Sequence, residues 1–178
     1  MEKIIRFSDI PKFTRDGNWQ ADFDFIQLIK FIDEHIENCG LQLNPDFQRG
    51  HVWTEEQQIK WIEFFLRGGR TSRIIYLNKP DWNTSVPNGA YNDFVCVDGL
   101  QRITAIRKFV DGKIPVFGSY INEFEDTMSL VRDCIKVNIN DLKTEKEVLQ
   151  WYVDMNAGGT PHTSDEIGRV KKMIQELG

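Results

Sequence analysis

Residues 95–112 read Val-Cys-Val-Asp-Gly-Leu-Gln-Arg-Ile-Thr-Ala-Ile-Arg-Lys-Phe-Val-Asp-Gly, and the rest of the chain can be arranged around them. The apolar run at 94–97 is short and rich in β-branched residues, which favours a strand buried on both faces. Apolar residues then recur at helical spacing from Ile103 to Val110, and Gly112 ends that pattern. The stretch therefore predicts a strand, an Asp-Gly turn and a helix.

The predicted turn would suit an anion such as a phosphate. The first N–H groups of a helix lack intrahelical partners, and the helix dipole is positive there. Arg102 falls in that first turn, where a cation is unfavourable unless something negative binds. Asp98 could hold a divalent metal through water, act as a base toward water, or simply cap the helix. Gly99 would allow a sharp turn or a close approach to a ligand.

The pentapeptide Asp98-Gly99-Leu100-Gln101-Arg102 resembles the Asp-Gly-Gln-Gln-Arg signature of the N-terminal domain of GmrSD-type modification-dependent restriction enzymes. That family is related to the ParB and sulfiredoxin fold. Two more blocks occur in the family's order, Asn-Pro-Asp-Phe-Gln-Arg-Gly-His-Val-Trp at 44–53 and Trp-Tyr-Val-Asp-Met-Asn-Ala-Gly-Gly-Thr-Pro at 151–161. Leu100 replaces the family's usual Gln and the reactive Cys of sulfiredoxins, so we do not expect sulfiredoxin chemistry.

The patterns along the chain predict a single α+β (mixed α/β) domain over residues 1–178. The resemblance adds a ParB/sulfiredoxin-like architecture: a small mixed sheet flanked by helices, a core at about 41–140 and a helical extension at about 144–178. Residues 1–22 read as an irregular arm or a short strand, and 79–93 as a long loop. Helices are predicted between Asp24 and Gly40, between Thr54 and Gly68, and after Thr144 and Thr163; further strands or extended pieces are predicted at 41–43, 73–77, 114–117 and 135–139.

Two arginines are the candidates for gripping phosphate oxygens. Arg49 and Arg102 carry guanidinium groups, whose planar fork of donors matches phosphate. A structural ion pair with Asp46 or Asp98 is the alternative. Under the resemblance, the catalytic candidates are Asp98, Gln101 and Arg102, and Asp98 is also the candidate metal ligand.

Other residues could complete such a site. Gln48 and Gln101 would orient a ligand or a water, unless they are ordinary polar residues of a loop and a first helical turn. Trp53 would stack on a base or anchor the core. The stretch 156–160 could form an anion-binding nest from Asn156, Gly158, Gly159 and Thr160, or serve as a helix end and linker. The arginines of 67–73 form a local basic stretch that could contact a nucleic-acid backbone.

These residues lead to one functional hypothesis and two alternatives. The first is a domain that binds, and could hydrolyse, a nucleoside triphosphate with Mg²⁺ in a DNA restriction, phage-defence or counter-defence system. The second is a small metal-dependent DNA-binding or nuclease module that uses the same pocket. The third is a catalytically inactive regulator that binds a larger restriction-type protein complex. The expected partners are therefore a nucleoside triphosphate and, in the alternatives, DNA or that protein.

Composition limits these hypotheses. A net charge of −5 counts against a broad nucleic-acid platform, because non-specific DNA affinity comes mainly from Lys and Arg neutralising phosphates. No apolar run reaches the 18 residues of a membrane span, and the first residues do not resemble a secretory signal, so a cytoplasmic protein without a membrane partner is expected. Three cysteines without paired spacing suggest reduced, buried thiols. The oligomeric state is left open.

Overall fold

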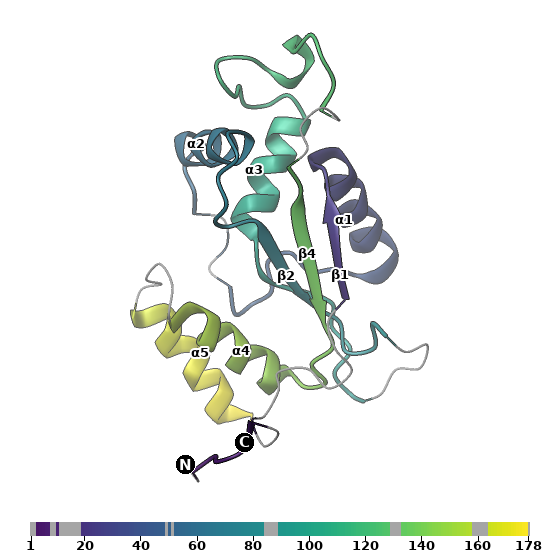
Figure 1. Ribbon diagram of the computed structural model, residues 1–178. Helices are drawn as coiled ribbons and strands as arrows, with labels where there is room; N and C mark the ends of the chain where they lie inside the picture. Colours follow the sequence, from purple (N-terminus) through teal and green to yellow (C-terminus); the bar gives the residue numbers. More distant parts are fainter. Residues whose placement is uncertain are drawn as a thin grey trace.

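A four-stranded mixed sheet forms the centre of the protein (Figure 1). The computed structural model describes residues 3–7, 10, 19–48, 50, 52–83, 89–128, 133–157 and 164–177. The strands lie in the order β1-β4-β2-β3, with β1 antiparallel to β4, β4 parallel to β2, and β2 antiparallel to β3. They are β1 (Trp19–Phe23), β2 (Ile74–Asn78), β3 (Val95–Asp98) and β4 (Ile135–Asn140). The predicted mixed α+β class is confirmed.

Two helices begin at residues whose side chains cap them. Asp24 accepts a hydrogen bond from the backbone N–H of Gln27 at the start of α1, and Thr54 forms a capping box with Gln57 at the start of α2. None of the described helices has the length and apolar content needed to cross a membrane. The helices are α1 (Phe25–Cys39), α2 (Glu55–Leu66), α3 (Leu100–Val110), α4 (Glu145–Ala157) and α5 (Ser164–Glu176), with a 3₁₀ turn η2 (Ile121–Glu123).

Two hydrophobic cores lie on opposite faces of the sheet. Side chains alternate along a strand, so Ile75 and Leu77 of β2 enter the first core while Tyr76 between them faces the second. The first core is covered by α3, which packs against α1 and α2. The second core joins β3 to α4 and α5, which pack on each other as a helical hairpin away from α1 and α2 (Figure 1). The sheet therefore has helices on both faces.

Three short extended segments differ in how far they form strands. The N-terminal arm becomes a strand only from Trp19 onward; residues 11–18 lie outside the described part. The strand predicted at 41–43 is reduced to one parallel bridge between Gln42 and Val95. The segment predicted at 114–117 forms a single bridge, from Val116 to Ser119. These two predictions of extended pieces were therefore too long.

The turn between β3 and α3 requires a glycine. Gly99 has a φ of 135° and a ψ of −5°, a conformation that L side chains rarely adopt. A Cβ atom placed on Gly99 would lie 2.9 Å from Cγ2 of Ile75, which is fully buried in β2. Backbone conformation and close packing thus both exclude a side chain at this position.

Replacing Gly99 by alanine should lower the free energy of unfolding by about 2–4 kcal/mol, because backbone strain and the clash with Ile75 add together. Urea denaturation would measure the change.

The matched control is Gly168→Ala in the middle of α5, where a Cβ would meet nothing within 4 Å. That change should leave stability unchanged or raise it by up to about 1 kcal/mol. Equal effects at the two glycines would contradict the assigned turn.

Candidate functional site

A β-bulge directs Asp98 out of the sheet. Tyr76 pairs with Asp98, whereas the next residue, Leu77, pairs with Cys96, so Val97 is an extra residue on β3. Strict alternation would have placed Asp98 on the same face as Cys96, inside the first core. After the bulge, Asp98 is paired with Tyr76 instead, and its side chain is 45% exposed. The bulge therefore makes this carboxylate available to a ligand.

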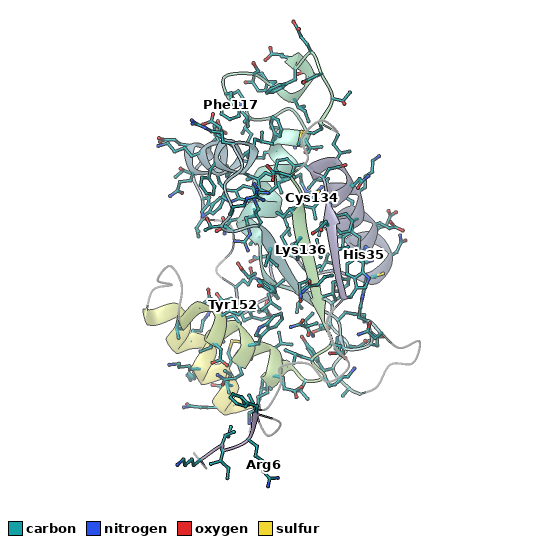
Figure 2. All side chains as sticks on the ribbon, in the orientation of Figure 1. Arg6, His35, Phe117, Cys134, Lys136 and Tyr152 are labelled. Carbon is teal, nitrogen blue, oxygen red and sulfur yellow. The ribbon has the colours of Figure 1, made fainter. Side chains whose placement is uncertain are left out.

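A cavity of about 300 Å³ opens beside Asp98. Its walls come from the β3–α3 turn, from the loop between α1 and α2, from the loop before β2, and from α4. Tyr152 lies on the side of α4 that faces the sheet (Figure 2). The cavity thus lies between the two helical layers, and its lining residues are Gln48, Gly50, Trp53, Ser72, Val97, Asp98, Gly99, Leu100, Gln101, Arg102, Tyr152, Met155 and Asn156.

Asp98 and Arg102 form an ion pair on the floor of this cavity. Nη2 of Arg102 lies 2.6 Å from Oδ2 of Asp98 and also donates to the carbonyl of Ile74, at 3.0 Å. The Arg102 side chain is only 12% exposed, and its buried Nε has no hydrogen-bond partner among the described residues. Of the roles open to Asp98, helix capping is wrong, because Gly99 is the N-cap of α3 and no side chain caps it.

The two glutamines fix the wall of the cavity. Oε1 of Gln101 accepts from the N–H groups of Val52 and Trp53 at 3.0 and 3.1 Å, and its Nε2 donates to the carbonyl of Gly50 at 2.9 Å. Nε2 of Gln48 donates to the carbonyl of Cys96 in β3. These amides therefore hold the 48–53 loop against the β3–α3 turn, a role that the sequence analysis did not consider.

Trp53 is both a core residue and part of the cavity lining. Its ring lies 6.0 Å from that of Trp61, tilted by 50°, and packs against the first core. The core-anchor interpretation of Trp53 is thus confirmed, and stacking on a base stays a prediction.

Helix α4 contributes a wall that the sequence analysis largely missed. Asn156 lies within α4 and donates from Nδ2 to the carbonyl of Tyr152, at 2.7 Å, so it is not part of the linker after the helix. Tyr152 and Met155 line the cavity beside it, one helical turn apart, which is the only sequence signal they offered. The other residues of the predicted nest, Gly158, Gly159 and Thr160, and also Arg49, lie outside the described residues.

Ser72 is a further cavity residue that the sequence did not single out. It has a φ of 56°, one of two positive values found for non-glycine residues in the described chain, and it lines the cavity. The loop that carries it is anchored by Arg73, which donates to Asp133 at 2.7 Å and to the carbonyl of Phe65 at 3.0 Å. Arg70 lies 3.9 Å from the same Asp133. Arg73 is therefore tied into an ion pair, whereas the Arg70 side chain is 84% exposed and makes only a long contact with the same carboxylate.

Asp98 is the acidic residue of the cavity lining that could help to hold a metal ion. No group of three or more His, Cys, Asp or Glu residues that could hold a metal occurs in the part of the chain that the structure describes. Asp98 is an accessible carboxylate that lines the cavity. Mg²⁺ commonly binds through one or two carboxylates plus substrate phosphates and waters, so Asp98 fits this mode and not a closed protein cage.

The cysteines do not offer a nucleophile to the cavity. Burial raises the pKa of the Cys96 thiol to about 12, so it stays protonated at neutral pH. Cys39 and Cys134 are exposed, which corrects the expectation that all three thiols are buried.

Comparison with protein-family models matches residues 26–133 to "GmrSD restriction endonuclease, N-terminal domain". The matched stretch runs from α1 to the segment before β4 and includes the loop and turn that form the floor of the cavity. It does not include α4 or α5. A search of curated proteins found no match.

Removing the Gln101 amide should destabilise the 50–53 loop. We expect Gln101→Ala to lower the free energy of unfolding by about 1–3 kcal/mol, because two backbone N–H groups and one carbonyl lose their partner. The tryptophan fluorescence of the folded protein should also change, because Trp53 is held by this contact. Chemical denaturation followed by fluorescence measures both.

Gln150→Ala serves as the control, since Gln150 is exposed and its amide donates to Asp154 one turn along α4. It should shift stability by no more than about 0.5 kcal/mol. A Gln101 variant that behaves like this control would show that the amide does not hold the loop.

Proposed function

The chain belongs to the family of the GmrSD restriction endonuclease N-terminal domain, and from this premise we propose that the cavity at the start of α3 binds the phosphates of a nucleoside triphosphate together with Mg²⁺. The family places the protein in a DNA restriction or phage-defence system. Within such a system, this domain would be the part that handles the nucleotide.

The observation that carries the proposal is the state of Arg102. Its guanidinium is largely buried and is held by Asp98 and by the carbonyl of Ile74, while its buried Nε has no partner among the described residues. It lies in the first turn of a helix whose N-terminus has no side-chain cap. A cation kept at the positive end of a helix dipole favours an anionic ligand, and a guanidinium binds phosphate oxygens through paired donors.

The size of the cavity supports a phosphate chain with part of a nucleoside. Its volume of about 300 Å³ is at the lower end of small-molecule sites. The apolar lining from Trp53, Tyr152 and Met155 lies alongside the polar floor of Asp98 and Arg102. We infer that the phosphates lie on the polar floor and that the nucleoside lies toward the aromatic side.

Rapid hydrolysis is not part of the proposal. Position 100 of the motif carries Leu, and the amide of Gln101 is engaged with the backbone of the 50–53 loop. Asp98 is the described carboxylate that lines the cavity, and Arg102 holds one of its oxygens. We therefore expect binding with slow turnover, so that the bound nucleotide acts mainly as a ligand.

A DNA-binding module is less well supported. The chain has a net charge of −5, and two of the arginines in the 67–73 stretch are close to Asp133. Both observations reduce the positive potential that DNA phosphates would need.

Binding of ATP, GTP, CTP or UTP with Mg²⁺ should stabilise the wild-type protein. At a ligand concentration one hundred times the Kd, the free energy of unfolding should rise by about 2.7 kcal/mol. Arg102→Ala should weaken binding by about 30-fold or more, since it removes a desolvated charge from the floor of the site. Thermal shift and calorimetry measure these effects, and Arg102→Lys shows how much of the binding needs only a positive charge.

Arg107→Ala is the matched control on the same helix, because Arg107 pairs with Asp33 on the surface at 2.5 Å and does not line the cavity. It should leave the Kd unchanged. The proposal would be contradicted if none of the four nucleotides binds the wild type. It would also be contradicted if Arg102→Ala and Arg107→Ala lose affinity to the same extent.

Asp98→Asn should separate the two roles of the carboxylate. Without Mg²⁺ the variant should bind the nucleotide several-fold more tightly, because a negative charge that faces Arg102 leaves the site. The additional affinity that Mg²⁺ gives the wild type should largely disappear. Calorimetry with and without Mg²⁺ would measure both changes, with Asp33→Asn as the control; an unchanged Mg²⁺ effect would exclude Asp98 as the metal ligand.

A further inference from the structure

We propose that Arg169 on α5 is a positioning residue for the nucleotide pocket, because it ties the loop that carries Gln48 to the α4–α5 hairpin. This inference rests on the proposed function and adds a means of regulating the same site. Helices α4 and α5 lie beyond the residues matched by the family model. The affinity of the pocket would thus depend on a part of the chain that the family pattern does not describe.

Arg169 reaches across more than 120 positions of sequence to the pocket loop. Its Nη2 donates to the carbonyls of Phe47 and Gln48, at 3.2 Å each. Two neighbouring carbonyls that share one guanidinium nitrogen fix the direction of the backbone between them. The loop is further held by a hydrogen bond from the N–H of Gln48 to the carbonyl of Pro45, at 2.9 Å.

The same loop is packed against α4 by its aromatic side chain. Phe47 is 6% exposed, and its ring meets that of Tyr152 edge-on, with centroids 5.3 Å apart and an interplanar angle of 64°. Tyr152 also lines the nucleotide pocket. Val170, next to Arg169 in α5, belongs to the same buried core as Phe47 and Tyr152. The hairpin therefore contacts the loop through a polar group and through an apolar one.

The same loop is hydrogen-bonded to the strand that carries Asp98. Gln48 donates from its side chain to the carbonyl of Cys96, two residues before Asp98 in β3. Gln48 and Asp98 both line the cavity. A displacement of α5 would therefore move one wall of the pocket relative to the ion pair of Asp98 and Arg102, and ligand binding would in turn favour the docked position of the hairpin.

The test uses three variants of the full chain. Arg169→Met removes the donors and keeps a long apolar stem, Arg169→Lys restores one donor group, and Lys172→Met is the matched control on the same helix. Lys172 is an exposed residue whose ion pair with Glu176 has a long distance of 3.9 Å. For each protein, calorimetry gives the Kd of the best nucleotide with Mg²⁺, and a thermal melt without nucleotide gives the Tm.

We expect Arg169→Met to weaken nucleotide binding by about three- to tenfold, as for the loss of hydrogen bonds from a charged donor. Arg169→Lys should recover part of this loss, and Lys172→Met should bind like the wild type. The Tm of the ligand-free protein should change little, since Arg169 is exposed. A loss of affinity at similar Tm, partly restored by lysine, distinguishes positioning from general destabilisation.

Two results would overturn the inference, and they can be told apart. If the wild type binds no nucleotide, the proposed function fails and this inference fails with it. If the wild type binds but Arg169→Met has an unchanged Kd, only the role of Arg169 is wrong. Should Arg169→Met unfold at a much lower temperature, its Kd is measured well below that temperature, where the protein is folded, and an unchanged Kd there would contradict the proposal.

Discussion

The close approach of Gly99 to Ile75 is the constraint on which the site depends. Because no side chain can stand between the β3–α3 turn and β2, the helix starts directly against the sheet. Arg102 can then reach both the carbonyl of Ile74 in the neighbouring strand and the carboxylate of Asp98. The bulge at Val97 completes this geometry, because it turns Asp98 from the buried core toward the cavity. Turn, bulge and ion pair are thus three parts of one arrangement.

The polar residues of the motif divide into two groups with different tasks. The amide of Gln101 is hydrogen-bonded to the backbone of the 50–53 loop, and the amide of Gln48 donates to β3. These two side chains therefore shape the cavity. Asp98 and Arg102 remain as the charged pair that a ligand can meet. Some polar residues of this short motif therefore hold the cavity in shape, and they need not contact the ligand.

Local patterns in the sequence predicted the helices and the central motif well. The capping box at Thr54 and the apolar run at 94–97 depend on neighbours within a few residues, so they could be predicted directly. The bulge, the φ of Ser72 and the contribution of Tyr152 to the cavity could not, because each depends on packing between distant segments. The strand expected at 41–43 failed for the same reason: only Gln42 finds a partner in the sheet.

The most direct test of the account is to map, by amide chemical shifts, where a nucleoside triphosphate with Mg²⁺ binds on isotopically labelled protein. The account predicts that the largest shifts occur at the backbone N–H groups of Gly99, Leu100, Gln101 and Arg102, and that Gln48 and Tyr152 in the walls shift as well. Shifts confined to the surface of α1 or to the 111–128 segment, with the start of α3 unchanged, would contradict it.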